Sequence, residues 1–120
     1  MTTQKVDKSR LVSGSTTLLL LQLLSERPMY GYEMIETLQN RSQNVFELKA
    51  GTLYPLLHSM EQKKMLESYE KEVDGKRRKY YQITKAGMKH LDSKKREWEM
   101  YRNAVQRVLG GAAYDAVGIS

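Results

Sequence analysis

Residues 50–62, with the sequence AGTLYPLLHSMEQ, decide the fold, because they predict a helix with one apolar face and one polar face. The apolar side chains recur at i, i+3, i+4 and i+7, and they are Leu53, Leu56, Leu57 and Met60. Pro55 fits in a first helical turn, where a missing N–H is tolerated, so the helix should begin near Gly51. The opposite face is short and polar, with Thr52, Tyr54 and His58.

Two further helices are predicted before this one. Residues 15–26 carry leucines on nearly every helix face and end before Pro28, so this helix should lie at the centre of the fold. Residues 30–40 place their apolar side chains on one stripe, which is typical of an amphipathic helix on the surface. Residues 1–13 are polar and predict an N-terminal arm.

A β-hairpin is predicted after these helices. Residues 66–73 and 79–84 carry β-branched and aromatic side chains, and the turn dipeptide Asp74-Gly75 lies between them. The densest positive charge in the chain follows this turn and should form the hairpin tip; it comprises Lys76, Arg77, Arg78 and Lys79. The acidic side chains nearby are expected to point away from the tip.

A long last helix, residues 85–110, should follow with Thr84 as its N-cap. Its apolar residues fall on heptad-like positions, which Lys95 and Arg102 interrupt, so it predicts an imperfect dimerisation helix. Gly110 and Gly111 should end it, which leaves residues 111–120 as a tail. The residues expected to hold two chains together are Leu18, Leu91, Trp98, Val105 and Leu109.

This order of elements predicts a mainly α fold with a β-hairpin: a winged helix-turn-helix domain over residues 14–84, followed by the dimerisation helix. The third helix needs one apolar face for the first two helices and one polar face for the major groove, about 12 Å wide. Gly51 and Thr52 would meet a phosphate at the helix N-terminus, and Tyr54 and His58 would reach base edges or the sugar-phosphate. The basic hairpin would neutralise further phosphates. The candidate DNA-binding residues are Tyr30, Lys49, Gly51, Thr52, Tyr54, His58, Lys76, Arg77, Arg78 and Lys79.

Composition supports a nucleic-acid partner and argues against a metal site, a membrane span and export. Lys and Arg number 20 against 14 acidic residues, a net charge of +6, which favours a polyanion. No cysteine is present, which excludes thiolate metal sites and fits the cytoplasm. The leucine run is far shorter than the roughly 20 residues that cross a bilayer, and no signal-peptide pattern is visible. His58 and His90 are isolated in the sequence, so neither a metal nor a cofactor is expected.

The chain resembles the short branch of the PadR family of transcriptional regulators. The resemblance rests on YGYE at residues 30–33, GTLYP at 51–55 with Leu57 and Met60-Glu61, and GKRRKYY at 75–81 with Ile83-Thr84 and Gly87. It implies a homodimer in which the C-terminal helix packs against the partner's first helix, and an inverted-repeat operator, often beside the regulator's own gene. A bacterial cytoplasmic repressor is therefore expected.

The same resemblance implies a ligand site, since some short members bind flat aromatic compounds between paired tryptophans at the dimer interface. Trp98 occupies the matching place, and Leu18 and Arg102 are expected beside it. Lys94, Lys95 and Arg102 flank the tryptophan where an apolar pore would prefer neutral side chains. An anionic ligand, a planar ligand that forms cation–π contacts, or regulation without any small molecule therefore stays open.

The sequence also bears on two other function classes. An enzyme is not expected, because the sequence shows no nucleophile–base pair, paired carboxylates, phosphate-binding Gly loop or metal cluster. A winged-helix protein-interaction adaptor is the serious alternative, because the same fold serves both purposes. The basic hairpin beside a polar third helix favours DNA, since an adaptor has little need of it.

Overall fold

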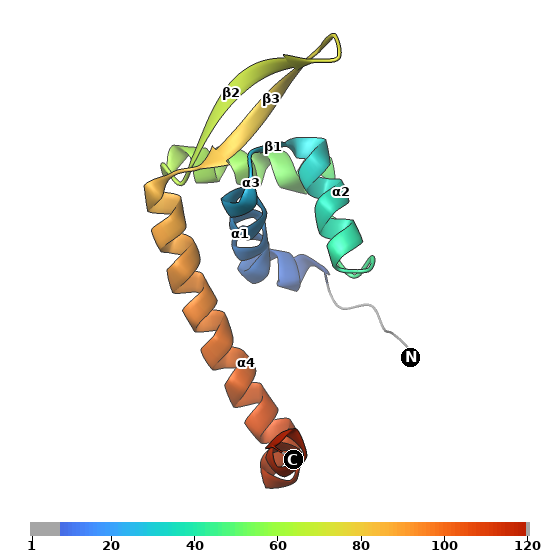
Figure 1. Cartoon of the computed structure of the whole chain (residues 1–120), viewed down its shortest axis with the longest axis vertical. Coiled ribbons are helices and arrows are strands. Elements are labelled where there is room, and N and C mark those ends of the chain that lie inside the picture. Colours follow the sequence, from blue (N-terminus) through green and yellow to red (C-terminus); the bar gives the residue numbers. More distant parts are fainter. Residues whose placement is uncertain (1–7, 120) are drawn as a thin grey trace.

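The computed structural model describes the backbone of residues 8–119 and the side chains of residues 15–110. A body of three helices carries a projecting hairpin, and a long helix leaves the body as a rod (Figure 1). The elements, in order, are α1 (Lys8–Glu26), β1 (Met29–Tyr30), α2 (Gly31–Arg41), α3 (Ala50–Gln62), β2 (Leu66–Val73), β3 (Lys76–Ile83) and α4 (Lys85–Ile119). This arrangement confirms the predicted winged helix-turn-helix with a C-terminal helix.

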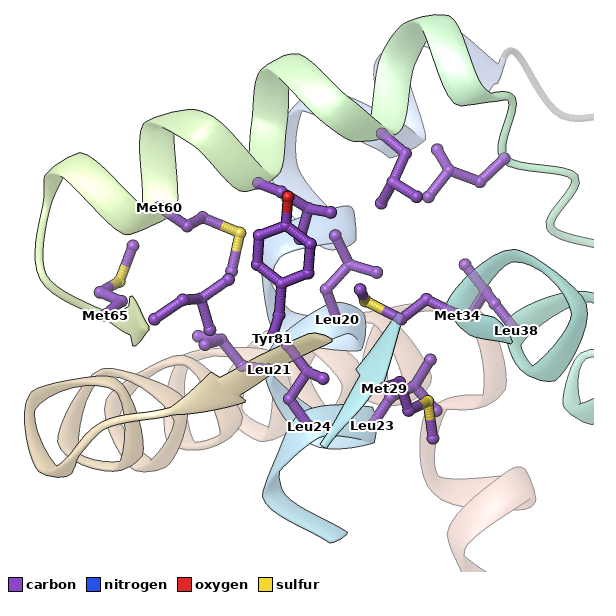
Figure 2. Packing of buried hydrophobic residues seen from close by; sticks show 14 of the residues in the cluster. Leu20, Leu21, Leu23, Leu24, Met29, Met34, Leu38, Met60, Met65 and Tyr81 are labelled. Carbon is purple, nitrogen blue, oxygen red and sulfur yellow. The ribbon is translucent and has the colours of Figure 1, made fainter. Parts of the chain in front are cut away.

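Helix α1 supplies the centre of the core, as its leucine run predicted. Leu20 and Leu21 are fully buried, and Leu23 and Leu24 nearly so. Figure 2 shows these side chains between β1, β3 and the other helices, with the ring of Tyr81 reaching from β3 toward α3. The sheet, α2 and α3 therefore pack on one apolar cluster, with the leucines of α1 at its centre.

The hairpin belongs to a three-stranded antiparallel sheet in the order β1-β3-β2. Asp74 and Gly75 have φ of 53° and 77°, so both turn residues are left-handed, as the tight hairpin predicted from this dipeptide requires. The short strand β1 was not predicted, because two residues are too few to show a period. It pairs Tyr30 with Tyr80 and so ties the start of α2 to the hairpin.

Two surface ion pairs join α2 to the end of α1 and to the residue that follows it. The guanidinium of Arg41 at the end of α2 binds the carboxylate of Glu26 at the end of α1, and this contact lowers the pKa of Glu26 to about 2. At the other end of α2, Arg27 Nη1 lies 2.5 Å from Glu33 Oε2. Because the paired side chains are partly exposed to solvent, these contacts contribute less to the packing of α2 than its buried side chains do.

Helix α4 is anchored where it begins. The hydroxyl of Thr84 donates to the carbonyl oxygens of Lys64 and Met65, and it accepts a hydrogen bond from the backbone N–H of Gly87 at 3.0 Å. A Cβ on Gly87 would lie 2.3 Å from the Met65 carbonyl oxygen. The predicted Thr84 cap is confirmed, and the glycine lets the helix backbone lie directly on the α3–β2 connection.

The predicted start of the first helix and the predicted end of the last helix were both wrong. Helix α1 begins at Lys8, so residues 8–13 belong to it and not to a polar arm; residues 1–7 of that arm lie outside the described residues. Helix α4 continues through Gly110 and Gly111 to Ile119. A glycine costs a helix about 1 kcal/mol, which weakens it without ending it, and residues 8–14 contain no proline to stop the helix.

Candidate nucleic-acid interface

Helix α3 has the two faces that its sequence predicted. Leu53 and Leu57 are fully buried against the core, while Thr52, Tyr54 and His58 are exposed. Lys49, also exposed, is the N-cap, with φ of −101° and ψ of 154°. The helix therefore presents a short polar face to solvent beginning at its positive N-terminal end.

Gly51 lies on this face with open space where a Cβ would be. Packing therefore does not require a glycine here, and the open surface leaves the first turn of α3 accessible to a phosphate.

Tyr54 lies against the first residue of α2. A Cβ on Gly31 would lie 2.2 Å from the Tyr54 hydroxyl oxygen, so only glycine leaves room for this ring position. The tyrosine side chain is still 46% exposed. Gly31 therefore sets the orientation of a side chain predicted to contact DNA.

A cradle opens beside this contact, with a volume of about 420 Å³. Segments distant in the sequence form it, and its lining residues are Tyr30, Gly31, Tyr54, Arg78, Lys79 and Tyr81. The guanidinium of Arg78 lies 4.2 Å from the centre of the Tyr30 ring, and Lys79 Nζ lies 5.5 Å from that of Tyr81. Burial raises the pKa of the Tyr81 hydroxyl, which stays protonated at neutral pH. Two cations and the N-terminus of α2 give the cradle the chemistry of a phosphate site.

The basic run of the hairpin divides between the two faces of the sheet. On one face, Arg77 Nε donates to Glu70 Oε1 at 2.7 Å, and Glu72 lies directly opposite Arg77. The expectation that the acidic neighbours point away is therefore wrong, because strand pairing sets them across from the basic residues. The run also lies along β3 beside the turn and not in a tip loop.

The other face of the hairpin is cationic, and we call Lys71, Lys76 and Arg78 its cationic face. Lys71 pairs with Arg78 across the strands, and the stacked rings of Tyr69 and Tyr80, 5.7 Å apart, lie beside them. The sequence reasoning missed Lys71 and both tyrosines. The period of two along each strand could have identified them. Alternate residues lie on opposite faces of the sheet, so the period divides the basic run between the faces once the strand register is known.

Helix α4 exposes an apolar stripe beyond its contact with the body. Trp98 is 46% exposed and Tyr101 64% exposed, with their ring centres 6.0 Å apart. Val105 and Val108 continue the stripe at the i+7 and i+10 positions. Tyr101 and Val108 were missed, although a heptad register begun at Trp98 would have found them.

The other predicted interface residues lie in different surroundings. Leu91 is 1% exposed and belongs to the core of its own chain, so its assignment to the dimer interface is corrected. Leu18 packs partly against the same core, whereas Arg102 and Leu109 are exposed on α4. One chain therefore does not combine the predicted ligand residues into a closed site.

Metal clusters and membrane-spanning helices are absent from the described residues. No group of three His, Cys, Asp or Glu side chains there could hold a metal ion. None of the helices in that part of the chain is long and apolar enough to cross a membrane.

Comparisons with known proteins agree with this geometry. The model of the transcriptional regulator PadR-like family matches residues 20–93. A transcriptional regulator of Mycobacterium tuberculosis is 36% identical over 78 residues, which are 65% of this chain and 70% of that protein. The crystal structure of a PadR-like transcriptional regulator from Bacillus cereus superimposes with a TM-score of 0.76 at 31% identity, covering 85% of this chain and 98% of that one. A PadR family transcription regulator from Clostridium difficile gives a TM-score of 0.70 at 36% identity, with 81% and 100% covered. The chain belongs to the PadR-like family of transcriptional regulators.

Proposed function

We propose that two copies of this chain bind an inverted-repeat operator on double-stranded DNA and repress transcription in the bacterial cytoplasm. The observation that carries the proposal is the cradle, because it gathers two cations, tyrosine rings and a helix N-terminus beside the exposed face of α3. A phosphate in the cradle would fix the register of α3 in the major groove. Family membership supports the same function, because the family consists of transcriptional regulators and not of enzymes.

Each candidate residue then has a distinct role. The first turn of α3, with Lys49, Gly51 and Thr52, would contact a phosphate, while Tyr54 and His58 face the groove. The cationic face of the hairpin would contact the flanking backbone or the minor groove.

The apolar stripe of α4 supports a homodimer, because Trp98, Tyr101 and Val108 are exposed in one chain at the spacing of a two-helix seam. A two-fold axis along this seam would set two copies of α3 about 34 Å apart, one turn of DNA.

Regulation by a ligand is a second part of the proposal. A planar aromatic compound could stack on Trp98 beside Arg102 and the partner's first helix near Leu18, and it would release DNA by favouring a different spacing of the two subunits. An anionic ligand would match Lys95 and Arg102, both exposed on α4. A repressor that needs no ligand is the simpler variant.

The adaptor alternative is disfavoured by charge. None of the described residues that line the cradle is acidic, and among the paired strand residues no carboxylate lies directly opposite a member of the cationic face of the hairpin. A surface used only for protein partners would not need this concentration of positive charge next to α3.

We expect Arg78→Ala to weaken DNA binding more than Arg77→Ala. Arg78 lines the cradle, whereas Arg77 is already paired with Glu70, so its charge is partly neutralised. Loss of one phosphate contact should reduce the slope of log K against log salt by about 1. Fluorescence anisotropy on a labelled duplex of the protein's own upstream sequence, at several salt concentrations, measures both quantities. Equal losses for the two variants would contradict the role of the cradle.

We expect Gly31→Ala to reduce operator affinity about 10-fold while leaving the protein folded. The new methyl group displaces the far end of a tyrosine side chain rather than backbone, so Tyr54 rotates away from the cradle. Tyr54→Phe is the matched control, because it keeps the ring and removes only the hydroxyl. Affinity on operator and scrambled DNA, together with circular dichroism, checks the prediction. Wild-type operator affinity in Gly31→Ala would show that the position of Tyr54 is unimportant.

A further inference from the structure

A second hollow lies on the molecule away from the cradle, where the end of α3 meets α1 and the start of α4. It has a volume of about 540 Å³, and we call it the α3–α4 groove. This volume falls in the range of roughly 300–1,000 Å³ that is usual for small-molecule sites. The proposed DNA contacts use none of its lining residues.

The exposed lining of the groove is more polar than apolar, and its apolar part is a small floor. Met60 and Met65 are 2% and 7% exposed, and Leu56 and Ala86 extend the apolar wall. Methionine side chains adapt to ligands of different shape, because they are unbranched and polarisable. The floor can therefore accept the body of an apolar or aromatic molecule.

The rim of the groove is cationic. Its two cations are Lys63, the C-cap of α3, and Lys94 on α4. The imidazole of His90 lies between Ala86 and Lys94, at four-residue intervals along one face of α4. Of the described residues that line the groove, none is acidic, and the ion pairs formed in the described part of the chain do not involve either lysine. The hydroxyl groups of Thr17 and Ser59 add hydrogen-bonding capacity. Such a rim favours a negatively charged group.

We propose that the α3–α4 groove binds a small organic anion, with its apolar body on Met60 and Met65 and its carboxylate or phosphate between Lys63 and Lys94. The bound molecule would contact the DNA-reading helix and the long helix α4 together. It could therefore bias the angle between them, provided that it binds one angle more tightly than another. The groove is separate from Trp98, so this site stands whether or not the tryptophan binds a ligand.

The test uses the full-length protein labelled at its methionine methyl groups with ¹³C, without DNA. Three probes share one aromatic body: 2-naphthoate, 2-naphthyl phosphate and the neutral 2-naphthalenemethanol. We expect the methyl signals of Met60 and Met65 to shift on titration with at least one of the two anions, and the alcohol to bind at least about 10-fold more weakly. The tighter of the two anions identifies a carboxylate or a phosphate ester as the natural head group.

Variants decide whether the charge is responsible. The double variant Lys63→Gln and Lys94→Gln should weaken anion binding about 10-fold or more. Lys89→Gln should not change it, because Lys89 is exposed on α4 and does not line the groove. Equal binding of alcohol and anions, or unchanged anion affinity in the double variant, would overturn the proposal. Quenching of Trp98 fluorescence without any shift of Met60 and Met65 would place the probe on α4 and would also overturn it.

Discussion

Gly87→Ala should lower the free energy of unfolding by about 3 kcal/mol. The added methyl group would lie 2.3 Å from the Met65 carbonyl oxygen, a backbone atom that cannot move without disturbing the α3–β2 connection. The displacement would also strain the hydrogen bonds of Thr84 to Lys64 and Met65, which anchor α4. Urea denaturation followed by circular dichroism measures the loss.

Gly51→Ala is the matched control for this variant. Gly51 also lies in a helix, but nothing is near its missing side chain, so alanine should be neutral or stabilising by up to about 1 kcal/mol. A Gly87→Ala protein as stable as the wild type would show that the close approach of α4 to the Met65 carbonyl is not a structural requirement.

The double variant Trp98→Asp and Tyr101→Asp should convert the protein to a monomer and reduce its operator affinity by about 100-fold or more. Both side chains are exposed neighbours on the apolar stripe of α4, so two buried charges would face each other across the proposed seam. A monomer would also lose the second half-site. Sedimentation velocity gives the mass, and anisotropy on the operator gives the affinity.

Met100→Asp is the control for the dimer variant. Met100 is 71% exposed but lies off the stripe that Trp98 and Tyr101 begin, so its charged replacement should leave the dimer intact. A Trp98 and Tyr101 double variant that remains dimeric would place the interface elsewhere on the chain.

Local patterns predicted the helical body well. The leucine run of α1 and the apolar spacing of α3 each predicted a buried face, and Asp74-Gly75 predicted a turn; the structure has all three. The helix ends were predicted poorly, because Gly110 and Gly111 weaken a helix by an amount that the rest of α4 can offset. Strand β1 was missed because it depends on pairing with a strand about 50 residues later.

The sequence predicted which residues belong to the candidate site, but it did not predict how they lie relative to one another. The basic run, Tyr30 and Tyr54 were each identified, yet no spacing in the sequence places Tyr54 against Gly31. Strand register also divides the basic run. It places Arg77 beside Glu70, with which it pairs, and Arg78 in the cradle. Leu91 was assigned to the proposed dimer interface because it lies one heptad before Trp98, but its side chain packs in the core of its own chain.

We expect two chains to read one operator through α3 and the cradle. Native mass spectrometry of the purified protein with a duplex from its own upstream region, and with a scrambled duplex of equal length, tests it most directly when combined with a competition titration. We expect a complex of two chains per duplex and a preference of about 1,000-fold or more for the upstream sequence. Equal binding to both duplexes, or one chain per duplex at saturation, would contradict it.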